Sequence, residues 1–289
     1  MPKPKLLILI PAYNEESRIG PTLERFGRYY QGDFPMETRV VVVLNGCRDN
    51  TLGVVQSVAA QYPCIGWTVF NAAIGKGGAI IEGLKLSHTA DLIGFVDADG
   101  ATGPESFGNL ARGCLEPGVD CVVGSRRVPG SIIHQAQPSN RLLASKVFHF
   151  IVEALFHMGI KDTQCGAKVM RQAAVMRIHE SLHIADMAFD INLLYCLKRS
   201  GYRLKESPVE WTDHLGSTVR YFRTSLVMFL SVCRLRLVHS PFRFLLRWAR
   251  PLVARIYISL RNPPPLEAPT PDVPTIYQVG KEQTPTSGT

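Results

Sequence analysis

The feature that most constrains the fold is a short apolar run, Gly94-Phe95-Val96, which ends in two carboxylates spaced one residue apart, Asp97 and Asp99. A near-continuous apolar run is typical of a buried strand in a parallel sheet. In open α/β sheets the ligand lies beyond the carboxyl ends of such strands. Side chains two residues apart lie on the same side of an extended chain. The pattern therefore predicts a sheet edge at which Asp97 and Asp99 face one ligand.

Two carboxylates that face one point favour Mg²⁺ or Mn²⁺ bridged to a substrate phosphate, because hard cations prefer oxygen ligands. The alternative is a solvated turn at the end of a strand, since Asp and Gly are also common in turns. On these residues alone both interpretations stay open.

The length of 289 residues and the 46% share of apolar side chains allow a large core, so we expect either one large domain or one domain with appendages. The first apolar run, 6–10, is too short for a secretory signal, and no stretch approaches the roughly 20 apolar residues of a membrane span. The seven cysteines form no Cys-x-x-Cys pair. Such a set favours reduced thiols in the cytoplasm and does not imply zinc.

The net charge of +8 is concentrated near the C-terminus, because residues 215–262 contain nine arginines and neither a lysine nor an acid. A near-neutral body with a basic, apolar C-terminal region favours an anionic membrane surface as partner over nucleic acid. Within this region, 241–250 has a helical pattern with Arg243, Arg247 and Arg250 on one face and apolar side chains opposite. The alternative is a helix packed on the body with its arginines in solvent.

Short apolar strands alternate with helical patterns, which indicates βαβ units and a mostly parallel, Rossmann-like α/β sheet with flanking helices. Besides the strand that ends at Asp97, strands are expected at 5–11, 39–44, 68–70, 121–124 and 209–211. Helices are expected at 18–29, 52–61, 75–86, 140–158 and 190–199. We divide the chain into an α/β domain (1–215), a basic membrane-associating helical region (216–261) and a disordered, proline-rich tail (262–289).

Polar residues follow several of the predicted strands. The stretch Pro11-Ala-Tyr13-Asn-Glu15 follows the first strand, Asn45 ends the second and Asp97 ends the fourth. These ends meet at one edge of a doubly wound sheet. The carbonyl of Asn45 can accept a hydrogen bond from a nucleobase N–H, and Glu15 can hold a base or ribose group. Together with the carboxylate pair they predict a site for a nucleotide and a metal ion.

Two short motifs have more than one interpretation. Gly75-Lys76-Gly-Gly opens a helical pattern and resembles a phosphate cradle, because free amides and the helix dipole favour anions. Its spacing is not that of a Walker A loop, and a close-packing turn is the alternative. His179-Glu180-Ser-Leu-His183 matches the H-E-x-x-H pattern of zinc proteases but lacks the distal histidine, so a zinc hydrolase is the weaker hypothesis.

Several segments between residues 10 and 219 together resemble one family. They are IPAYNEE from Ile10, GKGGA from Gly75, DADGAT from Asp97, GSRR from Gly124, DTQCG from Asp162, FDINLL from Phe189, SPVEW from Ser207, and Gly216-Ser217. The chain resembles a family 2 glycosyltransferase with the GT-A fold. Within that family it most resembles the dolichyl-phosphate (polyprenyl-phosphate) β-glucosyltransferases.

The resemblance implies transfer of a sugar, with inversion, from a nucleotide diphosphate to the phosphate of a membrane polyprenol. The expected donor is UDP-glucose, and the expected place is the cytoplasmic face of a membrane, where the enzyme attaches peripherally. Asp97 and Asp99 would hold the Mg²⁺ or Mn²⁺ and the diphosphate. The nucleotide pocket would contain Pro11, Tyr13, Glu15 and Asn45, and Arg126 and Gln164 would lie near the donor phosphates, the sugar or the acceptor.

A monophosphate acceptor is largely a dianion near neutral pH and needs no general base, whereas a hydroxyl acceptor does. The protein would then hold two anionic groups together, and candidate cations for this are Arg126, Arg127, Arg141 and Lys168. Rival hypotheses are an enzyme of the same fold with a soluble or other membrane acceptor, and a non-catalytic membrane-surface module.

The sequence departs from the family pattern at three places. Leu44-Asn45 stands where the family has Asp-Asp, Ala167 replaces an aromatic residue and Met187 replaces a tryptophan. We therefore expect base recognition, and the contacts to sugar and lipid, to differ from those of the family.

Overall fold

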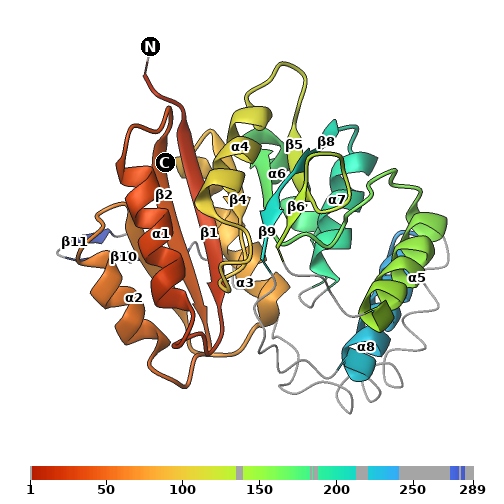
Figure 1. Cartoon of the computed structure of the whole chain (residues 1–289), viewed down its shortest axis with the longest axis horizontal. Coiled ribbons are helices and arrows are strands. Elements are labelled where there is room, and N and C mark those ends of the chain that lie inside the picture. The colour runs from red at the N-terminus through yellow and green to blue at the C-terminus, as the bar shows by residue number, and fades with distance from the viewer. Residues whose placement is uncertain are drawn as a thin grey trace.

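The computed structural model describes residues 2–134, 139–182, 184, 188–212, 221–240, 274–279 and 281–283, and it shows a central sheet flanked by helices (Figure 1). The strands are β1 (Lys5–Ala12), β2 (Glu37–Asn45), β3 (Ile65–Phe70), β4 (Leu92–Phe95), β5 (Cys121–Ser125), β6 (Ile132–Ile133), β7 (Lys168–Arg171), β8 (Leu204–Pro208), β9 (Glu210–Trp211), β10 (Ile276–Gln278) and β11 (Lys281–Gln283). The α-helices are α1 (Ile19–Gln31), α2 (Thr51–Ala59), α3 (Gly75–Leu84), α4 (Pro104–Cys114), α5 (Ser139–Phe156), α6 (Gln172–Ile178), α7 (Phe189–Arg199) and α8 (Tyr221–Val238); short 3₁₀ helices are η1 (Lys85–Thr89) and η2 (His179–Ser181).

The main sheet has the strand order β11-β10-β3-β2-β1-β4-β7-β5-β8. Strands β3, β2, β1 and β4 run parallel, as do β5 and β8, whereas β7 runs antiparallel to both of its neighbours. The predicted class, a mostly parallel α/β sheet with flanking helices, is confirmed. The antiparallel strand β7 was not expected from the sequence.

Both faces of the sheet are covered, which explains why its central strands are apolar throughout. In β1, Leu7 and Leu9 face the layer that contains α3, α6 and α7, whereas Leu6 and Ile8 face the layer of α1, α2 and α4. All four side chains are at most 1% exposed. Each such side chain contributes about 1.5–3 kcal/mol of hydrophobic free energy.

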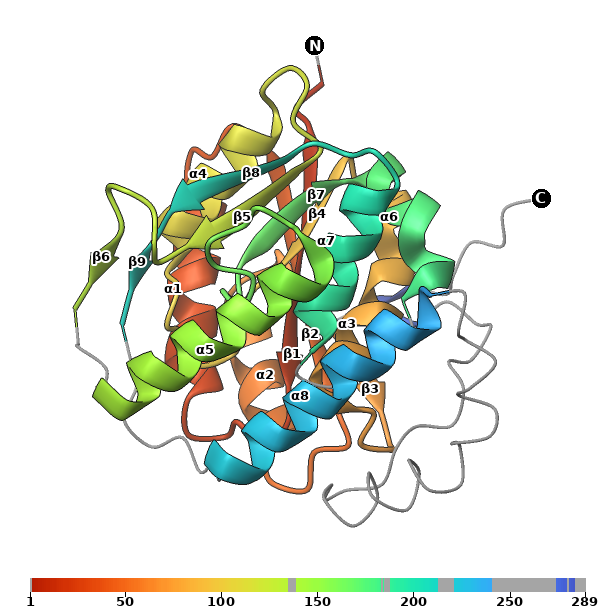
Figure 2. The ribbon, with the colours of Figure 1, turned by 90° about the vertical axis from the view of Figure 1, so that its right-hand side faces the viewer.

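Helices α5 and α8 lie side by side and extend from the body of the molecule (Figures 1 and 2). Val152 of α5 and Val232 and Leu235 of α8 are buried in the same apolar cluster as the helices over the sheet. Among the described helices, none combines the length and the apolar character that a bilayer span requires. The predicted helix at 241–250 and the predicted boundary at residue 215 lie outside the described residues.

The prediction of a disordered tail over 262–289 is wrong for two short segments. Strand β10 pairs antiparallel with the edge strand β3, and β11 pairs with β10. Ile276 is buried on the sheet, and the ring of Tyr277 stacks on that of Trp67 at a centroid distance of 6.4 Å. Two apolar side chains within a proline-rich, polar stretch thus provide enough burial to cover part of the β3 edge.

Candidate active site

A cavity of about 290 Å³ opens beyond the carboxyl ends of β2, β1 and β4, at the sheet edge that the sequence predicted. It is lined by Pro11, Ala12, Tyr13, Glu15, Arg18, Asn45, Ala73, Gly75, Lys76, Asp97, Ala98 and Asp99. Every residue that was predicted to contact the nucleotide or the metal ion therefore lies around one cavity. Segments separated by more than 80 residues meet here because their strands are neighbours in the sheet.

The two carboxylates reach the cavity in a different way from the one expected. Strand β4 ends at Phe95, and a turn at residues 98–99 separates Asp97 from Asp99, so the assumption of an extended chain between them is wrong. In this turn an oxygen of Asp99 accepts a hydrogen bond from the backbone N–H of Ala101 at 3.0 Å. Gly100 follows with a φ of 72°, which an L side chain rarely adopts. Both carboxylates still line the cavity.

Lys76 pairs with the first of these carboxylates. Its Nζ lies 2.6 Å from Oδ1 of Asp97, from a position at the start of α3. Burial raises the pKa of Asp97, Lys76 lowers it, and the nearby charges of Asp99 and Asp190 raise it again, with a net upward shift. Burial lowers the pKa of Lys76, but Asp97 outweighs this effect and the net shift is upward, so Lys76 stays cationic. The excess of carboxylates makes this wall attractive to a further cation.

The donor set fits a hard divalent cation. Asp97 and Asp99 offer only carboxylate oxygens, which Mg²⁺ and Mn²⁺ prefer. Gly166 leaves room beside the second oxygen of Asp97, because a Cβ at this position would overlap that carboxylate. No cluster of three or more His, Cys, Asp or Glu side chains suited to a metal ion occurs in the described part of the chain. A metal held by these two carboxylates would therefore need further oxygen ligands from substrate or water.

Arg18 also lines the cavity and was not predicted from the sequence. Its guanidinium donates two hydrogen bonds to the carboxylate of Glu15, at 2.8 and 2.9 Å. Burial raises the pKa of Glu15, and Arg18 offsets this only in part. The backbone N–H of Glu15 donates to the hydroxyl of Thr51 at 2.9 Å, which ties the β1–α1 loop to the start of α2. In the sequence, only the spacing of three residues from Glu15, a predicted nucleotide-pocket residue, could have indicated Arg18, and such a spacing alone is weak evidence.

The side-chain carbonyl of Asn45 contacts the protein backbone. Its side-chain oxygen accepts a hydrogen bond from the backbone N–H of Ile74 at 2.5 Å, and the side chain is buried. One lone pair of that oxygen is therefore engaged by the protein backbone, and acceptance from a base N–H stays a prediction.

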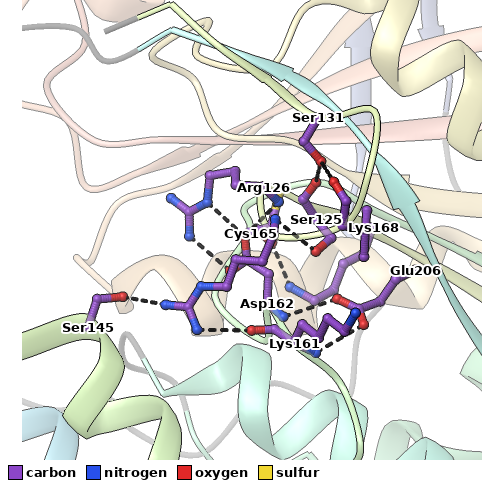
Figure 3. Close-up of polar contacts among 11 residues, drawn as sticks. Ser125, Arg126, Ser131, Ser145, Lys161, Asp162, Cys165, Lys168 and Glu206 are labelled. Carbon is purple, nitrogen blue, oxygen red and sulfur yellow. Dashed lines mark hydrogen bonds and ion pairs between the residues drawn. The ribbon is translucent and has the colours of Figure 1, made fainter. Parts of the chain in front are cut away.

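Arg126 does not line the main cavity but lies in a network beside it (Figure 3). Its guanidinium donates to both oxygens of Asp162, at 2.8 and 2.9 Å, and its backbone N–H donates to the same carboxylate at 3.0 Å. The guanidinium also lies 5.2 Å from the ring centroid of Trp211. Burial lowers the pKa of Arg126, but its hydrogen bonds to Asp162 outweigh this effect and the net shift is upward. The network adjoins the cavity through Gly166, which packs against the Asp97 carboxylate.

A second, smaller cavity of about 20 Å³ adjoins this network and contains Gln164. It is lined by Arg127, Ser145, Phe148, His149, Asp162, Thr163 and Gln164. Arg127 donates to the carbonyl of Lys161 at 3.0 Å and to the hydroxyl of Ser145 at 2.7 Å. Within the described residues, Nε2 of Gln164 and Nδ1 of His149 are buried without a hydrogen-bond partner. This cavity is thus rich in donors and contains unpaired polar atoms.

Lys168, a predicted charge-clamp residue, lies elsewhere. It is fully buried, and its ammonium contacts Oδ1 of Asp190 at 2.5 Å and the carbonyl of Cys165 at 2.7 Å. It therefore links the start of α7 to the Asp162–Gly166 loop rather than facing a ligand, and the prediction is wrong. A buried lysine requires such partners because an unpaired charge in the core is costly. The side chain of Arg141 lies outside the described part of the structure.

The H-E-x-x-H pattern does not form one continuous helix. Helix α6 ends at Ile178, and His179 begins the 3₁₀ helix η2. The Nε2 atom of His179 donates to the carbonyl of Ile81 at 2.8 Å, so the ring is held by the protein. His183 and Met187 lie outside the described residues. All seven cysteines are described, and each is a free thiol.

Comparison with known proteins places this cavity in context. The chain is similar to a dolichyl-phosphate β-glucosyltransferase of Dictyostelium discoideum, with 30% identity over 253 residues, 83% of this chain and 75% of the relative. It is 32% identical to the human dolichyl-phosphate β-glucosyltransferase over 240 residues, 78% of this chain and 73% of the relative.

A solved structure shares the fold. Glucosyl-3-phosphoglycerate synthase of Mycobacterium tuberculosis, crystallised with Mn²⁺, UDP and glucosyl-3-phosphoglycerate, superposes with a TM-score of 0.60 at 16% identity and covers 80% of each chain. Residues 7–178 match the model of a family described as glycosyl transferase family 2, and this range contains the whole lining of the main cavity. The chain is therefore a member of glycosyl transferase family 2 and a glycosyltransferase.

Proposed function

We propose that this enzyme transfers glucose, with inversion, from UDP-glucose to a polyprenyl monophosphate at the cytoplasmic surface of a membrane, with the aid of Mg²⁺ or Mn²⁺. The observation that carries the proposal is the arrangement of the Asp97, Asp99 and Lys76 wall beside the Asp162–Gly166 loop. Gly166 of this loop packs against Asp97, on the wall of the main cavity, and Asp162 and Gln164 line the donor-rich second cavity. The wall with the carboxylates and Lys76 and the donor-rich second cavity thus share one loop.

The main cavity suits a nucleotide diphosphate donor. Its carboxylates and Lys76 suit a metal ion and phosphates, while Pro11, Ala12 and Ala73 provide apolar walls for a base or ribose. The names of the relatives support glucose as the sugar and a dolichyl phosphate as the acceptor. The solved structure with UDP and Mn²⁺ supports a uridine donor and a divalent metal.

In the proposed reaction an oxygen of the acceptor phosphate forms a bond to the anomeric carbon. The bond from that carbon to the diphosphate breaks, and its electron pair leaves with the diphosphate. A metal ion bound by Asp97 and Asp99 would neutralise charge on this leaving group. Lys76 adds a second cation at the same wall, 2.6 Å from Asp97. No residue has to remove a proton, because the acceptor is already largely a dianion.

The acceptor phosphate would lie on the side of the second cavity. There Arg127, Gln164 and His149 offer hydrogen-bond donors, and two of their nitrogen atoms have no partner among the described residues. Arg126, held by Asp162 and Trp211, lies beside this cavity, and its guanidinium charge is paired with the Asp162 carboxylate. These groups would offset the repulsion between a diphosphate and a phosphate dianion that approach each other.

Membrane attachment is proposed to involve the paired helices α5 and α8 with the basic region that follows. Val147 and Phe150 of α5 are 52% and 73% exposed, and Phe229 of α8 is 40% exposed. Exposed apolar side chains next to an arginine-rich segment are typical of proteins that bind anionic lipid surfaces. Arg127 links this region to the second cavity through its hydrogen bond to Ser145 of α5.

The test is transfer of radiolabel from UDP-glucose to a short polyprenyl phosphate, with Mn²⁺ or Mg²⁺ and with a chelator. We expect metal-dependent label in the organic phase with polyprenyl phosphate and none with the corresponding free polyprenol. Label on 3-phosphoglycerate instead would favour a soluble acceptor. Absence of transfer to any acceptor, together with vesicle binding, would favour a non-catalytic membrane module.

A further inference from the structure

We infer that Asn45 reads the nucleobase of the donor as a hydrogen-bond donor, through its NH₂ group, so that the site does not select for the imide N–H of uracil. This inference rests on the proposed function, because it takes the occupant of the main cavity to be a nucleotide. It concerns a property of this chain, since the residue at the end of β2 decides which edge of a base can pair there.

The orientation of the Asn45 amide follows from its partner. The backbone N–H of Ile74 can only donate, so the side-chain atom that it meets at 2.5 Å must be the carbonyl oxygen. Rotation of the amide by half a turn would place two donors against each other. The NH₂ group therefore forms the other branch of the planar amide, directed away from the Ile74 N–H. No polar contact of this NH₂ group occurs among the described residues, and Asn45 lines the cavity.

The backbone around Asn45 holds the amide in place. Asn45 is the last residue of β2 and pairs with Phe70 of β3. Gly46 follows with a φ of 65° and accepts no side chain, because a Cβ there would lie 2.7 Å from the Cα of Ala73. The β2–α2 and β3–α3 loops are thus in direct contact at this point. A buried amide between two packed loops cannot turn away to suit a ligand.

The base would lie at the Asn45 end of the cavity. Asp97 and Asp99 follow β4, which β1 separates from β2 in the strand order, and together with Lys76 they suit the diphosphate and metal ion. On the β2 side the lining includes the neutral residues Asn45 and Ala73. A nucleotide that places its phosphates beside Asp97 and Asp99 would therefore extend its base toward Asn45.

An NH₂ group at this position can donate to a carbonyl oxygen or to an unprotonated ring nitrogen, but it cannot pair with an N–H. Uracil carries an N–H at ring position 3, whereas cytosine carries an acceptor there. Both bases carry a carbonyl oxygen at position 2. The NH₂ group of Asn45 can therefore pair with either base, and because the carbonyl oxygen is held against the Ile74 N–H, the group that the amide offers to a base does not recognise the uracil imide. An aspartate at the same position would present an acceptor and would recognise it.

Asn45→Asp is a near-isosteric test of this inference. One carboxylate oxygen can still accept from Ile74, so the loop contact is kept, while the NH₂ donor becomes an acceptor. We would measure the affinities of UDP and CDP for the full-length protein by calorimetry in the presence of Mn²⁺. The ratio of the two affinities removes any general effect of the added negative charge. Asn50→Asp adds the same charge on the neighbouring loop at an exposed position outside the cavity lining, and serves as the matched control.

We expect the wild-type protein to bind UDP and CDP with affinities within about threefold of each other, and Asn45→Asp to raise the UDP-to-CDP ratio by about tenfold. Asn50→Asp should leave the ratio unchanged. A wild-type protein that strongly favours UDP, or a ratio that does not rise in Asn45→Asp, would overturn the inference while leaving the proposed function intact. If neither nucleotide binds the wild-type protein, the proposed function itself fails.

Discussion

The ammonium of Lys76 lies 2.6 Å from a carboxylate oxygen of Asp97, although the two residues follow different strands of the sheet. Lys76 opens α3 after β3, and Asp97 follows β4, with β2 and β1 between them in the strand order. The helix start thus reaches across the carboxyl ends of two strands to complete one wall of the cavity. This contact gives the wall both a fixed cation and an excess of carboxylate oxygens.

The first prediction concerns this cation. Lys76→Met should lower kcat/KM for the nucleotide-sugar donor by about tenfold, because a charge-assisted contact to the donor phosphates is lost. Steady-state kinetics at saturating metal measure the effect. Lys85→Met is the matched control, because Lys85 lies one residue beyond α3, pairs with Glu82 and does not line the cavity. Equal losses in both variants would contradict a role of Lys76 at the donor.

The second prediction concerns the buried pair between Lys168 and Asp190. Lys168→Met should lower the free energy of unfolding by about 3–5 kcal/mol, because it leaves the Asp190 carboxylate buried without its partner. Urea denaturation measures this value. The exposed pair of Lys205 and Glu116, with an N–O distance of 2.6 Å, provides the comparison, and Lys205→Met should cost less than about 1 kcal/mol. A small effect of Lys168→Met would mean that the core pair does not stabilise the loop.

The third prediction concerns the dependence of stability on pH. Burial raises the pKa of Asp162, but the hydrogen bonds and charge of Arg126 outweigh it and hold the pKa below its usual range. At pH values between the lowered pKa of the folded protein and the ordinary pKa near 4, the unfolded chain binds more protons than the folded protein. The contribution of Asp162 to stability is therefore complete above about pH 5 and is lost as the pH falls. Asp162→Asn should therefore flatten the acid limb of the unfolding profile. The same change at the exposed Asp33 should leave the limb as steep as in the wild type.

The fourth prediction concerns membrane attachment. Phe150→Ser on α5 should weaken binding to vesicles that contain anionic lipid by about five- to tenfold, because an exposed aromatic side chain no longer inserts. Co-sedimentation with vesicles measures the bound fraction. Met176 on α6 is also an exposed apolar residue, at 60%, and Met176→Ser should bind like the wild type. If both variants bind equally well, the surface of α5 does not contact lipid.

Much of the fold was predictable because the patterns of the strands and helices, and the polar residues at the strand ends, are local features of the sequence. The alternation of apolar strands with helical patterns predicted β1, β2, β4 and β5, and their carboxyl ends predicted which residues meet at the cavity. The edge strands β10 and β11 were not predicted, because Ile276 and Tyr277 are too few to give a periodic signal. Their pairing depends on a neighbour, Trp67, more than 200 residues away in the sequence.

Most of the residues that line the main cavity were predicted, but the contacts between side chains around it were not. Nothing in the local sequence shows that Arg126 meets Asp162, or that Lys168 turns into the core toward Asp190. These contacts depend on the insertion of antiparallel β7 between β4 and β5, which brings the loop before it to the cavity. The orientation of the Asn45 amide likewise depends on a backbone N–H from a different loop.

The most direct test of the central claim compares wild type and Asp99→Asn in transfer of label from UDP-glucose to polyprenyl phosphate with saturating Mn²⁺. Asp99→Asn keeps an oxygen that can accept from Ala101, so the turn should persist and the melting temperature should change little. The account predicts that the variant transfers label at least about 100-fold more slowly than the wild type, because one charged oxygen ligand of the metal and diphosphate is lost. Transfer by the variant at a rate close to that of the wild type would contradict the assignment of this cavity as the catalytic site.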